Sequence, residues 1–69
     1  MNPTEDLNSL KDELVENIIK KIGNPVDANA VLVAIEMSGI TNYIAYEKYK
    51  AQNLEELANE IFRKATWFV

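Results

Sequence analysis

The sequence contains no cysteine and no histidine. The lack of cysteine excludes disulfides and thiolate zinc sites, and the lack of histidine removes the commonest ligand of zinc and copper sites. Nucleophilic catalysis by a serine or cysteine beside a histidine base is excluded in the same way. We therefore expect no metal site, no cofactor and no enzymatic activity.

Basic residues are scarce as well. Seven lysines and arginines stand against eleven aspartates and glutamates, which gives a net charge of −4. A protein that binds the phosphate backbone needs clustered basic side chains, whereas the basic residues here occur as scattered pairs. We expect no direct binding of nucleic acid.

Long apolar runs are absent too. No run approaches the roughly 20 residues needed to span a bilayer, and the first residues lack the basic region and apolar stretch of a secretory signal. We expect a soluble cytoplasmic protein without membrane contact. No segment alternates apolar and polar residues with the period of two that marks a strand, and the fold class that remains is all-α.

Helical periodicity is what the sequence does contain. It predicts four helices, at residues 3–22, 28–38, 42–52 and 54–65. Gly23 and Gly39 are placed to end the first two helices, and Asp27 to cap the second. The helices are expected to form one domain, a compact bundle over residues 1–69. Its predicted core contains Leu10, Leu14, Ile18, Val31, Ile35, Leu57 and Ile61.

Two local side-chain contacts are predicted in addition. Val26 precedes the cap of the second helix and is placed to pack on Val31 as a hydrophobic staple. In the last helix Glu60 can pair with Lys64, one turn further on. Such contacts matter because a domain of 69 residues without cross-links has little reserve of stability and relies on tight packing or self-association.

The most informative segment is VDANAVLVAIEMSGI, residues 26–40, which as a helix is apolar almost all the way round. Only Asn29 and Glu36 are strongly polar within it, and a separation of seven residues places them on nearly the same line. Leu32 and Val33 flank that line. A helix without a polar face must be covered on every side, so we expect the third helix, the C-terminal residues or a second chain to lie over it.

Two groups of aromatic residues admit two interpretations each. Tyr43, Tyr46 and Tyr49 form a stripe at three-residue steps, which suits either the core or an interface, where tyrosine is enriched. Trp67 and Phe68 belong to an apolar C-terminal segment that either folds back over the bundle or enters a groove on another chain.

The first helix is strongly acidic. Among residues 1–19, Lys11 is the one basic residue against five acidic ones. A solvated outer face explains this composition, and so does a surface that meets a basic partner. A compact acidic protein can also occupy a nucleic-acid-binding site in place of the nucleic acid.

One part of the sequence resembles a known family. Met37-Ser38-Gly39-Ile40, a helix, Asn53-Leu54-Glu55, Ala58 and Ile61-Phe62 are similar to ubiquitin-associated domains. In that family a Met-Gly-aromatic loop and the last helix form a binding patch. Here Ser38 separates the methionine from the glycine, and Ile40 replaces the aromatic residue. The resemblance covers residues 31–62 and implies a three-helix unit with an added N-terminal helix, not the family's binding activity.

The sequence therefore favours a small, non-enzymatic module for protein–protein interaction. We expect it to act as an adaptor or inhibitor of a larger protein partner, with a homodimer as one form of the hypothesis. The residues expected to bind a protein are Leu32, Val33, Tyr43, Tyr46, Tyr49, Trp67 and Phe68. The alternative hypothesis is an acidic inhibitor, a nucleic-acid mimic that occupies a basic nucleic-acid-binding site.

Overall fold

The chain folds into four helices joined by short connections. The computed structural model describes the backbone of residues 3–67 and the side chains of residues 7–66. The helices are α1 Pro3–Ile22, α2 Ala28–Met37, α3 Asn42–Glu47 and α4 Leu54–Trp67. No strand occurs in the described range, and the predicted all-α bundle is confirmed.

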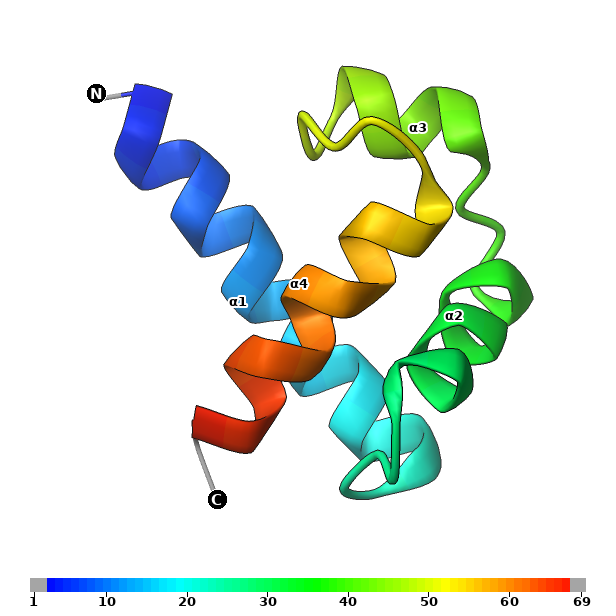
Figure 1. Cartoon of the computed structure of the whole chain (residues 1–69). Coiled ribbons are helices and arrows are strands. Elements are labelled where there is room, and N and C mark those ends of the chain that lie inside the picture. Colours follow the sequence, from blue (N-terminus) through cyan, green and yellow to red (C-terminus); the bar gives the residue numbers. More distant parts are fainter. Residues whose placement is uncertain (1–2, 68–69) are drawn as a thin grey trace.

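The central element of the bundle is α4, which contacts the other three helices. α1 crosses α4, α2 packs beside it, and the short α3 lies over its N-terminal end (Figure 1). The core is one cluster of apolar side chains drawn from all four helices and from the segment before α4. Of the predicted core residues, Leu10 packs half-buried against this cluster and the others are buried. The buried ones are Leu14, Ile18, Val31, Ile35, Leu57 and Ile61.

Both ends of α2 have the predicted caps. At the start, the Asp27 carboxylate accepts a hydrogen bond from the backbone N–H of Ala30 at 2.8 Å, which satisfies one of the free donors of the first turn. At the end, Gly39 adopts the left-handed conformation with φ +86°. The N–H of Ile40 then donates back to the Ile35 carbonyl at 3.3 Å, and this pattern terminates the helix.

The predicted staple at the start of α2 is wrong. Val26 remains 85% exposed, whereas Val31 is fully buried. The reason is that Val31 lies on the face of α2 that packs into the core, while the residues leading to the cap stay at the surface.

α3 ends at Glu47 and not near residue 52 as predicted. Lys50 takes a left-handed backbone conformation with φ +58°, and the N–H of Ala51 donates to the Ala45 carbonyl at 2.9 Å. This turn brings Tyr49 and Ala51 into the core, where both are buried. The burial of these two side chains outweighs the helical preference of the segment. The helix therefore ends about five residues earlier than predicted.

Two ion pairs join α1 to α4. Lys11, a buried cation, pairs with Glu60, and the Lys64 ammonium lies 3.3 Å from an Asp12 carboxylate oxygen. The predicted pair between Glu60 and Lys64 is therefore wrong, because each of these side chains has a partner on α1. Since the Lys11 side chain is only 10% exposed, its charge is poorly hydrated and favours a carboxylate beside it, which Glu60 supplies.

Candidate protein-binding surface

Four large apolar side chains on α2 and α3 lie exposed to solvent. Val33 is 48% exposed, Met37 78%, Tyr43 72% and Tyr46 64%. We call these four residues the outer apolar surface. Val33 and Met37 are four residues apart and therefore share one face of α2. Most of the large apolar side chains that are exposed in the described part of the chain belong to this surface.

The outer face of α2 is not covered by α3. α2 packs against α4 and α1, whereas α3 packs against α4 and lies beyond the C-terminal end of α2 (Figure 1). The inner face of α2 is buried, but Asn29, Val33, Glu36 and Met37 on the opposite face are exposed. We expected the third helix, the C-terminal residues or a second chain to cover α2. The structure excludes the third helix as this cover.

The tyrosines of the predicted stripe are divided between surface and core. In α3, Ala45 is buried and Ile44 half-buried, which turns Tyr43 and Tyr46 outward. Tyr49 follows the end of the helix and is 6% exposed, with the Lys48 ammonium 5.6 Å from the centre of its ring. Two of the three tyrosines thus belong to the outer apolar surface, and the third helps to build the core.

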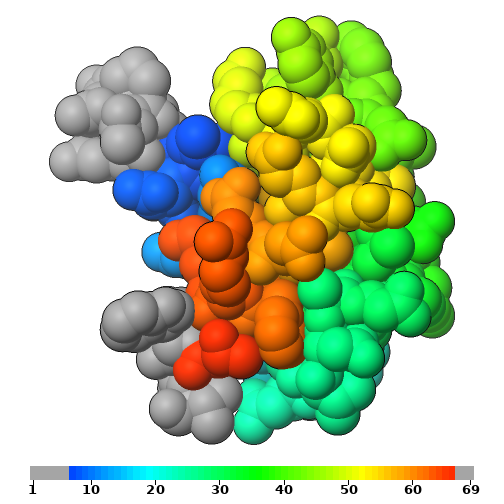
Figure 2. Space-filling view, in the orientation of Figure 1, coloured from blue at the N-terminus to red at the C-terminus, as the bar shows by residue number. Residues whose placement is uncertain are grey.

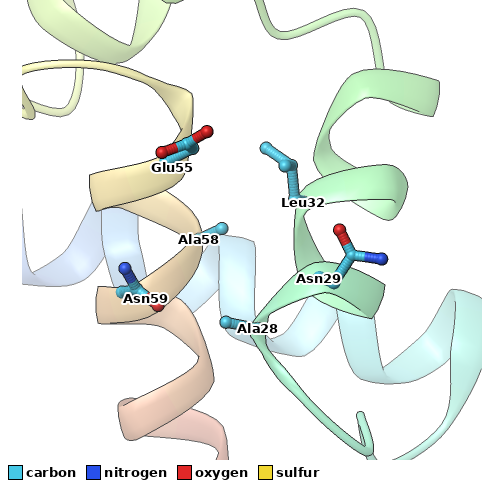
Figure 3. Close-up of a pocket in the computed structure, with 6 residues that line it drawn as sticks. All are labelled: Ala28, Asn29, Leu32, Glu55, Ala58 and Asn59. Atoms are coloured by element: carbon cyan, nitrogen blue, oxygen red, sulfur yellow. The ribbon is translucent and has the colours of Figure 1, made fainter.

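A groove runs along the seam between α2 and α4, beside the outer apolar surface. In the space-filling view it follows the boundary between the orange residues of α4 and the green residues of α2 (Figure 2). The short side chains of Ala28 and Ala58 point into the seam and leave a depression there, with Leu32 projecting from α2 towards Glu55 (Figure 3). We call this depression the α2–α4 groove. Its lining residues here are Ala28, Asn29, Leu32, Glu55, Ala58 and Asn59.

The groove continues towards the start of α3 as a second depression that shares Leu32 and Glu55. Glu36 and Asn42 line this part together with Asn53 and Leu54. Glu36 and Glu55 are both exposed, and neither belongs to an ion pair among the described residues. The groove therefore combines a half-buried leucine with two free carboxylates.

The two remaining predicted binding residues lie at the C-terminal end. Trp67 is the last residue of α4, but its side chain lies outside the described part of the chain, and so does the whole of Phe68. The prediction that they fold back or enter a partner therefore stays a prediction. Sequence reasoning missed Met37 as a surface residue, although its spacing of four from Val33 places it on the same face.

Neither a metal site nor a membrane span is evident in the part of the chain that the structure describes. No three acidic side chains gather there as a metal site would require. No described helix combines the length and apolarity needed to cross a bilayer. No protein-family model, curated protein or solved structure matches the chain.

Proposed function

We propose that this chain is a small protein-interaction module that acts as an adaptor or inhibitor by presenting its outer apolar surface to a protein partner. The observation that carries the proposal is the exposure of four large apolar side chains, between 48% and 78%, on two consecutive helices. Burial of such a side chain contributes about 1.5–3 kcal/mol. A partner that covers all four would therefore gain substantial free energy.

The residue types of this surface support the same proposal. Tyrosine supplies a large, rigid and amphipathic contact area, and methionine adapts to irregular partner surfaces. Both types are enriched in protein interfaces. Exposed polar residues lie on the same two helices as the apolar side chains: Asn29 and Glu36 on α2 and Glu47 on α3. An apolar centre with a polar rim is the usual composition of an interface.

A stable interface on this chain would extend beyond the outer apolar surface. The accessible surface of the chain is 4676 Å², and a standard interface buries roughly 800 Å² on each partner. That is about one sixth of the whole. The partner must therefore also cover part of the polar rim and the adjoining α2–α4 groove.

In one form of this proposal, the partner is a second copy of the chain and the protein is a homodimer. Self-association would bury apolar surface that four short helices leave open, and it would stabilise a domain without cross-links. Sedimentation over a wide concentration range measures this directly. Hydrophobic dimerisation predicts a mass that rises with concentration and changes little with salt, because salt screens charges and not apolar contacts.

The proposal as a whole is tested by capturing partners from the native cell with matched variants. Val33→Gln/Met37→Gln removes half of the outer apolar surface, whereas Val26→Gln removes an exposed valine elsewhere. We expect the double variant to lose the specific partner, or the dimer, and Val26→Gln to retain it. Equal capture by all three proteins would contradict the proposal.

The alternative function, an acidic inhibitor of a basic nucleic-acid-binding site, would use α1. Glu13 and Glu16 are exposed on that helix, while Asp12 is engaged by Lys64. Such binding would weaken steeply with added salt. It would also be lost in Glu13→Gln/Glu16→Gln and kept in the variants of the outer apolar surface, so the same capture experiment separates the two functions.

A further inference from the structure

We propose that the α2–α4 groove binds a partner segment in which an aliphatic side chain lies close to a lysine or arginine. This inference rests on the proposed function and specifies the chemistry of the partner. The groove adjoins the outer apolar surface along α2, because Leu32 and Glu36 of the groove lie on the same helix as Val33 and Met37.

The apolar part of the groove is suited to one aliphatic side chain. Leu32 is half-buried and projects across the seam, with Ala28 and Ala58 below it (Figure 3). A side chain laid against Leu32 would exchange water for contact with these three residues, and this exchange is favourable for aliphatic groups. The small size of the two alanines sets the depth of the groove.

The charged part of the groove is suited to a cation. Glu36 and Glu55 line the same depression from opposite helices, and no lysine or arginine lines it with them. Lys21 lies near the C-terminal end of α2, but its ammonium donates to the Ser38 hydroxyl at 2.9 Å and not to Glu36. A partner cation between the two carboxylates would be attracted by both.

Helix dipoles distinguish the two carboxylates and strengthen the argument for Glu36. Glu55 lies in the first turn of α4, where the positive end of the dipole stabilises a negative charge. Glu36 lies in the last turn of α2, which contains no basic residue, and there the dipole disfavours a negative charge. Folding accounts for Glu55 but not for Glu36, whereas a bound cation accounts for both.

The rim of the groove is held in place before any partner binds. The Asn42 side-chain oxygen accepts from the N–H of Leu54 at 2.9 Å, and the Asn53 side-chain oxygen accepts from the N–H of Glu56 at 2.8 Å. The first bond attaches the start of α3 to the start of α4, and the second caps α4. A rim that is already ordered reduces the entropy lost on binding.

The experiment selects ligands from a phage-displayed library of random 12-residue peptides, with the full chain as the target. We expect enriched peptides to carry a lysine or arginine within one helical turn of an aliphatic residue. Their affinity should fall about tenfold for Glu36→Gln/Glu55→Gln, since two charge contacts are lost. Glu13→Gln/Glu16→Gln removes the same charge from exposed positions on α1, outside the groove, and should leave the affinity within about twofold.

Three results would overturn the inference: no enrichment, enriched peptides without a basic residue, or equal loss of affinity in both double variants. Peptides that bind but lose affinity in Val33→Gln/Met37→Gln and not in Glu36→Gln/Glu55→Gln would also overturn it, while leaving the proposed function intact. Equal capture from the cell by the unchanged chain, Val33→Gln/Met37→Gln and Val26→Gln, together with the expected peptide selection, would instead overturn the proposed function and leave the groove as a binding site.

Discussion

α2 and α4 pack against each other, yet their exposed residues differ in kind. On α4 the exposed residues with described side chains are all polar. On α2 the exposed residues include Val33 and Met37 beside Asn29 and Glu36. Folding alone accounts for the pattern of α4, which is apolar where it is covered and polar where it is not. On α2, apolar side chains remain where the chain offers no cover.

The difference matters because α2 could fold equally well with polar residues on its outer face. Its inner face already supplies Val31, Ala34 and Ile35 to the core, and its two ends are capped by Asp27 and Gly39. Val33 and Met37 are 48% and 78% exposed and therefore add little to this packing. This difference supports the proposal that the outer face of α2 contacts another molecule.

The largest expected effect concerns the inner faces, on which the two helices should behave alike. Ile35 of α2 and Ile61 of α4 are both fully buried, so Ile35→Ala and Ile61→Ala should each cost about 2–5 kcal/mol. That approaches the whole stability expected of a core this small, roughly 3–5 kcal/mol. The milder Ile35→Val and Ile61→Val, at about 0.5–1.5 kcal/mol, permit measurement by urea denaturation. A much smaller loss for Ile35→Val would show that α2 is not a core helix.

The next largest effect is expected at Glu60, a polar residue of α4 that has a structural role. Glu60→Gln leaves the buried Lys11 ammonium without its counter-ion. We expect a loss of about 1–2 kcal/mol, less than the roughly 3–5 kcal/mol typical of fully buried pairs, because the Glu60 side chain is 29% exposed. The control Asp12→Asn breaks the exposed pair with Lys64 and should cost no more than about 0.5 kcal/mol. Equal losses in thermal or urea unfolding would contradict this distinction.

This pair also shows where prediction from sequence stops. The end of α1 and both ends of α2 could be predicted because their signals, Gly23, Asp27 and Gly39, act within one turn of the chain. The partner of Glu60 could not, since Lys11 lies 49 residues away in sequence and the crossing of α1 and α4 decides the contact. For the same reason the early end of α3 depended on core space that local propensity does not reveal.

A smaller and equal effect is expected at the N-terminal caps of the two helices. Asp27 accepts from the N–H of Ala30 and Asn53 from the N–H of Glu56, each at 2.8 Å. Asp27→Ala and Asn53→Ala should each cost about 1 kcal/mol, measured by urea denaturation. A far larger loss for Asn53→Ala would show that the bond between the starts of α3 and α4 depends on this cap, and the comparison of the helices would need revision.

The smallest expected effect on stability comes from substitutions on the outer face of α2, the face that distinguishes α2 from α4. Val33→Gln/Met37→Gln should change the free energy of unfolding by less than about 0.5 kcal/mol, as is usual for surface substitutions. Glutamine preserves helix propensity, so a change would report lost contacts. A loss above about 2 kcal/mol would mean that something covers this face in the isolated protein. Its dependence on protein concentration would identify a second copy as the cover.

The candidate site was only partly accessible from the sequence. The wheel of α2 correctly placed Leu32 and Val33 beside the polar line of Asn29 and Glu36, because helical geometry is local. Which side α4 would occupy was not visible, and that choice puts Leu32 in the groove and Val33 in solvent. The groove itself arises from alanines on two helices that meet only in the folded chain.

Site-specific photo-crosslinking in the native cell tests the central claim most directly. A photo-reactive phenylalanine derivative is placed at position 33, on the outer face of α2, or at position 26, which is more exposed but precedes the helix. The account predicts a discrete adduct, with another protein or with a second copy of the chain, from position 33 and not from position 26. No adduct from position 33, or the same adduct from both positions, would contradict it.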